Sequence, residues 1–197
     1  MVPGLEKILE KEFTVAYWIF VRQGANHSGI WKGEKVGWGP NFTFRILTTS
    51  NANMTWGTCT EGNENWFATD NAIKDKEWIH VCQTYDGSEA TGYVTMGGKT
   101  VIPPSGQGNP KASKAPLKLF KARPIEIGAG RAIGGNVGED TFADCDYDDL
   151  IIWDRSLEED EVKSLGKGKR PDQALLVKAH GKLSTTWGQV KSYNTMH

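Results

Sequence analysis

Residues 13–21, FTVAYWIFV, constrain the fold more than any other segment of this 197-residue chain. β-branched and aromatic residues favour strands, and successive side chains of a strand point to opposite faces. Both faces of this strand are apolar, so both have to be covered. The run therefore predicts a central strand in a layered β structure.

Similar short runs follow, with turn residues between them. The expected strands span residues 29–32, 42–49, 51–59, 77–85, 91–96, 99–101, 124–130 and 142–153. Strong turn signals occur at Asp86-Gly87 and at Gly97-Gly98, the second inside a hairpin. Proline predicts a loop over residues 103–116, and glycine predicts another over 131–138. About ten strands at this spacing predict an all-β fold, an antiparallel sandwich of two sheets.

One short helix is expected after the last strand. Ser156 and Glu159 have the spacing of a capping box, in which each residue binds a free backbone N–H of the first turn. Val162 and Leu165 give this helix one apolar edge, and Gly166 is suited to end it.

Charge and hydropathy exclude two classes of partner. The net charge is −1 and the pI is about 6.4, so the chain lacks the basic surface that nucleic acid requires. No apolar stretch approaches the roughly 20 residues that span a bilayer. The first residues, MVPGLEKILEK, lack the apolar run of a signal peptide. They start almost in mid-strand, and we expect the chain to be a piece of a longer protein.

Three cysteines leave two interpretations open. Cys59, Cys82 and Cys145 are too widely spaced for a zinc site of the CxxC type. They can serve as small apolar residues of the core. A Cys82–Cys145 disulfide is the alternative, if their strands are neighbours; an odd number leaves one thiol over.

Four aspartates in six residues, DCDYDD, precede the apolar end of the last strand. Alternation sends Asp148 and Asp149 to opposite faces, so at least one carboxylate is expected on a covered surface. A buried carboxylate needs hydrogen bonds, a partner charge or a metal. Two interpretations follow: Asp148 is a structural residue bonded to a turn, or Asp144, Asp146 and Asp148 bind Ca²⁺. Opposite faces exclude a catalytic pair on one glycosidic bond.

Seven of the eight tryptophans divide into two groups. Those inside strand motifs are expected in the core: Trp18, Trp78 and Trp153. Four others lie in or beside loop-rich segments with Asn, Gly and Thr, and aromatic faces there can stack on sugar rings. The predicted carbohydrate-binding residues are Trp31, Trp38, Asn41, Trp56 and Trp66, with residues 29–41 as the best loop. The alternative is that these rings anchor loops to the sheet.

Three spaced motifs resemble one family. FTVAYWIF, then EWIHVCQTYDGSEATGYVTMGGKTV, then IEIGAG with YDDLIIWDRSLEEDEVKSL are similar to the laminin-G-like, concanavalin A-like lectin/glucanase jelly roll. The resemblance implies a jelly-roll domain over residues 1–166, with its first strand incomplete. Residues 167–197 would be a linker and a tail that adds a strand. It also implies a structural role for Asp148 and a packed, structural His80.

The resemblance implies binding rather than catalysis. The leading hypothesis is a non-catalytic, lectin-like module of a larger extracellular or cell-surface protein, with a glycan as its partner and calcium as a structural ion. A protein–protein adhesion module of the same fold is the second hypothesis. A glycoside hydrolase or lyase is the third, and it is disfavoured because the acidic E-x-D-x-x-E strand of related endoglucanases is missing.

Overall fold

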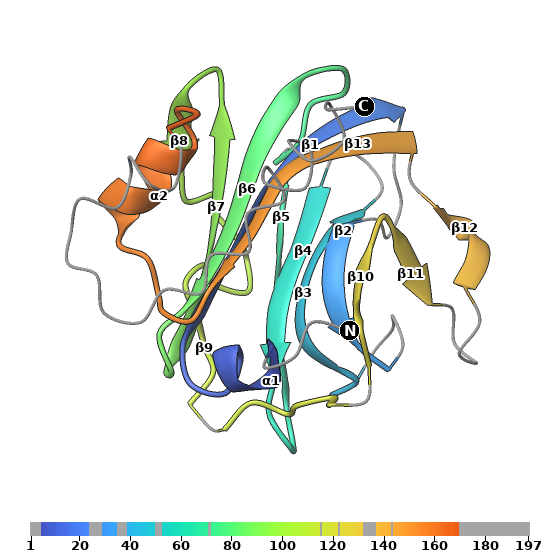
Figure 1. Ribbon diagram of the computed structural model, residues 1–197, viewed down its shortest axis with the longest axis vertical. Helices are drawn as coiled ribbons and strands as arrows, with labels where there is room; N and C mark the ends of the chain where they lie inside the picture. Colours follow the sequence, from blue (N-terminus) through green and yellow to red (C-terminus); the bar gives the residue numbers. More distant parts are fainter. Residues whose placement is uncertain are drawn as a thin grey trace, which may run out of the picture.

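Two antiparallel sheets pack face to face and enclose the core (Figure 1). The computed structural model describes residues 5–23, 29–34, 39–49, 53–70, 72–114, 116–121, 123–131, 137–142 and 144–169. The predicted all-β sandwich is confirmed. The expected tail beyond Lys169 lies outside the described residues. Within them, no helix has the length and apolar content needed to cross a membrane.

The larger sheet has six strands. Its order is β13 (Asp144–Trp153), β1 (Phe13–Gln23), β6 (Trp78–Tyr85), β7 (Glu89–Met96) and β8 (Lys99–Val101), and β9 (Lys111–Ala112) also pairs with β7. β1 lies between β13 and β6, which is the interior position that its two apolar faces predict. The β7–β8 hairpin turns at Gly97-Gly98, as expected.

The second sheet has five strands. Its order is β10 (Ile125–Ile127), β2 (Gly29–Gly33), β3 (Phe42–Thr49), β4 (Asn53–Cys59) and β5 (Glu64–Thr69). A separate pair joins β11 (Ala129–Arg131) to β12 (Val137–Phe142). The sequence predicted no strand at 137–141, where Gly, Glu and Asp are poor strand formers. A short helix, α1 (Leu5–Ile8), precedes β1.

Trp56 lies at the centre of the core between the sheets. It is fully buried, its ring stacks on Phe67 with centroids 6.1 Å apart, and its Nε1 donates a 3.1 Å hydrogen bond to Thr69. Gly92 of β7 lies against the indole from the opposite sheet. The indole ring is therefore packed on both sides, and its polar nitrogen has a hydrogen-bond partner inside the sandwich.

A β-bulge in β13 changes which way the aspartates point. Trp18 pairs with Asp148 but Ala16 pairs with Ile151, so two residues of β13 lie opposite Tyr17. Asp149 takes the extra position with a left-handed φ of 46°. Both Asp148 and Asp149 are exposed. The expectation that one of this pair is buried was wrong, because it assumed unbroken alternation.

Helix α2 (Glu159–Leu165) packs on the outer face of the six-stranded sheet (Figure 1). Val162 and Leu165 are buried there, and Gly166 is the C-cap, as predicted. The capping box lies two residues later than expected. Glu161 accepts a hydrogen bond of 3.0 Å from the Glu158 N–H, and Arg155 also donates a hydrogen bond to the Glu161 carboxylate.

All three cysteines are free thiols. Cys82 lies under α2 on the outer face, whereas Cys145 packs against the core between the sheets, and β1 separates their strands. The alternative of a Cys82–Cys145 disulfide was therefore wrong. Burial raises the pKa of Cys59 to about 12, which keeps that thiol protonated.

Replacement of Gly92 by alanine should destabilise the fold. A Cβ at this position would lie 2.8 Å from Trp56 Cδ2, and the enclosed indole cannot move aside. We expect the free energy of unfolding, measured with urea, to fall by about 2 kcal/mol. Gly62→Ala is the control, since no heavy atom lies within 4 Å of its added Cβ. Equal stability of the two variants would contradict this account of the core.

Candidate functional site

The outer face of the six-stranded sheet is only partly covered. Outward positions along β6 are Trp78, His80, Cys82 and Thr84, which follow from strand alternation. The helix α2 covers Cys82 together with Trp153 and Leu157. Two areas of this face remain, one on each side of the helix.

The first area is a group of aromatic rings that we name the aromatic platform: Trp18, Phe20 and Trp78. Phe20 and Trp78 are partners across β1 and β6, with ring centroids 5.6 Å apart. Trp78 is 45% exposed, and Trp18 and Phe20 are partly exposed. The prediction that Trp78 belongs to the core was wrong, because it begins its strand on the outward side, beyond the reach of α2.

Carboxylates border the aromatic platform along β13. Asp146 pairs with Phe20 and Asp148 pairs with Trp18 in the same cross-strand rows. Arg22 donates hydrogen bonds to Asp146 and to Asp144, the latter 2.9 Å long, and these bonds raise the pKa of the guanidinium. Asp148 accepts the backbone N–H of Asp149 at 2.9 Å. All four aspartates are exposed.

The three predicted calcium ligands therefore make two different kinds of contact. Asp144 and Asp146 both form ion pairs with Arg22, whereas Asp148 accepts a hydrogen bond from the backbone N–H of Asp149 in the bulge. No group of three His, Cys, Asp or Glu side chains in the described part of the chain is arranged to hold a metal ion. Calcium binding stays a prediction.

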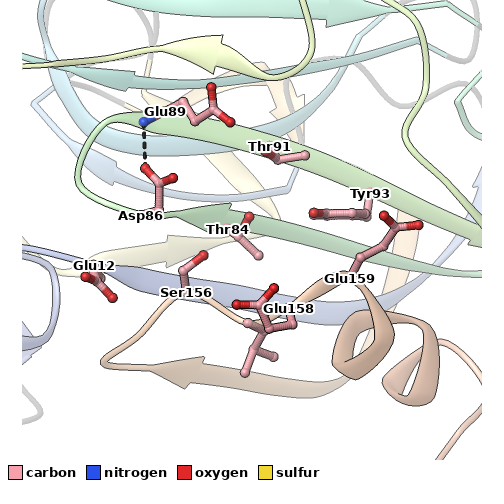
Figure 2. A pocket seen from close by; sticks show the side chains of 10 residues that line it. Glu12, Thr84, Asp86, Glu89, Thr91, Tyr93, Ser156, Glu158 and Glu159 are labelled. Carbon is pink, nitrogen blue, oxygen red and sulfur yellow. Dashed lines mark hydrogen bonds between the residues drawn. The ribbon is translucent and has the colours of Figure 1, made fainter.

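The second area is a polar pocket of about 430 Å³ beside the start of α2 (Figure 2). We name it the acidic pocket, because five carboxylates line it: Glu12, Asp86, Glu89, Glu158 and Glu159. Hydroxyl groups of Thr84, Thr91 and Tyr93 come from the floor formed by β6 and β7 (Figure 2).

The Asp86 carboxylate stabilises the turn between β6 and β7 and is not directed to a ligand. Its Oδ1 accepts hydrogen bonds of 2.8 Å from the N–H groups of Ser88 and Glu89 and from the Ser88 hydroxyl. Burial alone would raise the pKa of Asp86, but these bonds lower it below the ordinary value. Asp86 is thus a fixed anion and unsuited to act as a general acid.

The predicted tryptophan site lies on the other sheet. Trp31, Arg45, Gly57 and Trp66 form one cross-strand row over β2 to β5. Trp66 and Asn41 are partly buried near this row, and Trp38 lies outside the described residues. The structure therefore brings Trp31 and Trp66 onto one face.

Two of the predicted sugar-stacking rings are not accessible. Trp31 is 1% exposed and packs with Phe42, Leu47 and Cys59. Trp56 points the other way, into the core. Their assignment as stacking residues does not fit, because both lie inside strands rather than in loops. For Trp56, alternation with the buried Met54 was the signal that could have placed it.

A buried ion pair beside Trp66 was not foreseen from the sequence. The Arg45 and Glu64 side chains are 9% and 10% exposed, and their Nη1 and Oε1 atoms lie 3.0 Å apart. The guanidinium carbon lies 4.4 Å from the centroid of the Phe42 ring. Burial lowers the pKa of Arg45 and the Glu64 carboxylate opposes this shift. The pair neutralises itself, so it offers little net charge to a ligand.

Comparison of the sequence with protein families gave a match over most of the chain. The profile described as the concanavalin A-like lectin/glucanases superfamily, a laminin G family, matches residues 2–163. A comparison with curated proteins found no match.

Solved structures share the fold at low identity. The sialidase of Trypanosoma rangeli is 14% identical with a TM-score of 0.54, over 82% of this chain and 23% of its own. The CBM40 of the Ruminococcus gnavus IT-sialidase, bound to α2,3-sialyllactose, is 12% identical with a TM-score of 0.53, over 83% and 87%. The receptor binding domain of botulinum neurotoxin mosaic serotype C/D is 12% identical with a TM-score of 0.51, over 84% and 38%. This chain thus spans less than a quarter of the sialidase.

His80 should make stability depend on pH. It is 3% exposed beside Trp18, with ring centroids 5.3 Å apart, and burial lowers its pKa to about 4. The unfolded histidine has a pKa near 6.5, so it gains its proton first, and stability is lost as the pH falls from 6.5 toward 4. We expect the free energy of unfolding to be about 2 kcal/mol lower at pH 5 than at pH 7.

His80→Phe should lose most of this difference, because it cannot be protonated. If that variant does not fold, an NMR titration of the native imidazole decides. A midpoint near 6.5 would contradict the buried, neutral state.

Proposed function

The chain belongs to the concanavalin A-like lectin/glucanases superfamily, and on that premise we propose that it is a non-catalytic carbohydrate-binding module. We place its sugar-binding surface on the aromatic platform. The module would belong to a larger extracellular or cell-surface protein, as the resemblance implies. Its partner would be a glycan or polysaccharide.

One observation carries the proposal: the aromatic platform and its carboxylates share the same outer face. Trp78 is 45% exposed beside Phe20, a degree of exposure unusual for a large apolar ring. Sugar rings present apolar C–H faces that stack on aromatic rings. Asp146 and Asp148 lie at the end of the same rows and can accept hydrogen bonds from sugar hydroxyls.

The non-catalytic part of the proposal rests on how the carboxylates are used. Asp144 and Asp146 share one guanidinium, and Asp148 binds its own backbone. A glycosidase needs one carboxyl group free to donate a proton and a second to attack or activate water. No such division of roles is set up among the described carboxylates of the platform.

The solved structures support a sugar-binding role through the fold alone. The R. gnavus CBM40 shares the sandwich over most of both chains, and its structure contains sialyllactose. Because identity is 12%, no residue role is carried over.

The alternative location for the sugar-binding site is around Trp66 and Asn41 on the five-stranded sheet. Trp38, which was predicted with them, lies outside the described residues. Trp66 is partly exposed on the outer face of the five-stranded sheet, 5.9 Å from the Arg45 guanidinium. Loss of binding in Trp66→Ala but not in Trp78→Ala would move the proposed site to that sheet.

A protein–protein module is the second candidate. Val101 and Ile102, at the end of the edge strand β8, are 36% and 38% exposed. An exposed edge strand with apolar side chains can pair with a strand of another protein. Absence of binding to any polysaccharide would favour this candidate.

Trp78→Ala should weaken binding to the polysaccharides that retard the native chain. Loss of one stacking ring is expected to weaken binding by about 1–3 kcal/mol, or roughly fivefold to 150-fold. The mobility of each variant in native gels that contain a neutral polysaccharide measures this effect. When the native chain is incubated with the same polysaccharides, no reducing ends should be released.

Ile127→Ala is the matched control, because Ile127 is 48% exposed on β10 in the other sheet. Both variants should keep the melting temperature of the native chain to within a few degrees. Unchanged retardation of Trp78→Ala would place the sugar site elsewhere.

Calcium binding by Asp144, Asp146 and Asp148 is proposed as a separate property. A ligand present at 100 times its dissociation constant adds about 2.7 kcal/mol to stability. The melting temperature should then rise on adding Ca²⁺ and fall with chelator, and Asp148→Asn should reduce both shifts. A melting temperature indifferent to calcium would sink this proposal.

A further inference from the structure

We propose that the aromatic platform selects glycans without anionic groups, meaning neutral or amino-substituted sugars, and rejects sialylated and uronic-acid glycans. This inference rests on the proposed function of the same surface and adds the chemical class of its ligand.

The border of the platform along β13 carries an excess of negative charge. Asp144, Asp146, Asp148 and Asp149 are all exposed, and Arg22 is the cation among them. Without Ca²⁺, four carboxylates against one guanidinium leave three negative charges unbalanced. An anionic sugar stacked on Phe20 or Trp18 would approach these charges along the cross-strand rows that contain them.

The single guanidinium is already engaged. Arg22 bonds to Asp144 and Asp146 at once, so a sugar carboxylate would have to compete with two protein carboxylates for it. An anionic ligand therefore lacks the cationic partner that recognition of a carboxylate ordinarily uses.

The floor of the platform supplies no replacement among the described residues. His80 lies beside Trp18, but burial keeps its imidazole neutral at physiological pH. In the loop before β6, Lys74 is ion-paired with Glu77, and Asp75 offsets Lys76. Strand β7 separates Lys99 of β8 from Trp78 of β6, and Lys99 is one cation against the excess of carboxylates.

The hydrogen-bonding groups beside the platform also favour ligands without carboxylates. Ionised carboxylates only accept hydrogen bonds, so Asp146 and Asp148 need a ligand that donates. Hydroxyl, amide N–H and ammonium groups of sugars donate, whereas sugar carboxylates only accept. Two residues along a strand separate these aspartates by about 7 Å, so one stacked sugar can reach either.

The test uses pairs of glycans that share a backbone and differ in charge. The pairs are hydroxyethylcellulose with carboxymethylcellulose, methyl-esterified with de-esterified polygalacturonate, and lactose with α2,3-sialyllactose; chitosan and chitin separate amino from neutral sugars. We expect the neutral member of every retained pair to bind at least about fivefold more tightly at low salt. The difference should narrow at 1 M salt, where the screening length is about 3 Å.

The double variant Asp146→Asn with Asp148→Asn should lose the preference for the neutral glycan of each pair. It should bind anionic glycans more tightly than the native chain does, because two repelling carboxylates are removed. Asp160→Asn is the control, since it removes one exposed carboxylate on α2, away from the platform. A native chain that prefers the anionic member, or a double variant with unchanged selectivity, would overturn the inference while leaving sugar binding intact. Absence of binding to every glycan would overturn the proposed function and this inference together.

Discussion

Coverage of both faces of β1 is the constraint on which the rest of the structure depends. The inner face, with Val15, Tyr17 and Ile19, packs against the five-stranded sheet around Trp56. The outer face needs a second cover, and α2 supplies it only at Ala16. Trp18 and Phe20, further along the same face, are left partly exposed. The aromatic platform is thus the part of a doubly apolar strand that one seven-residue helix does not reach.

The bulge in β13 connects this packing to the charge of the platform. Without the extra residue at Asp149, the inward Tyr147 and the inward Leu150 could not both face the core. The bulge keeps apolar side chains inside at both ends of the strand and turns the aspartates outward. The same local irregularity that completes the core therefore places carboxylates beside Trp18 and Phe20. The charge bias that we infer for the ligand follows from this packing requirement.

Much of the fold could be predicted because the signals are local. The central position of β1, the hairpin at Gly97-Gly98 and the buried edge of α2 all follow from periodicity and turn residues. The site could not be predicted in the same way. Trp31 and Trp78 both lie in strands, yet one is 1% and the other 45% exposed. Their exposure depends on which residues of distant strands and loops lie over them.

The sequence by itself determined the two-sheet sandwich, since alternation, turn residues and apolar runs act over a few residues. It also determined the family, through motifs that encode those strands. Only the tertiary structure decided which rings meet solvent, how Arg45 and Glu64 pair, and where Arg22 finds Asp144 and Asp146. Arg22 and Asp144 are 122 positions apart along the chain. Such contacts arise from strand order and a one-residue bulge, and no local pattern records either.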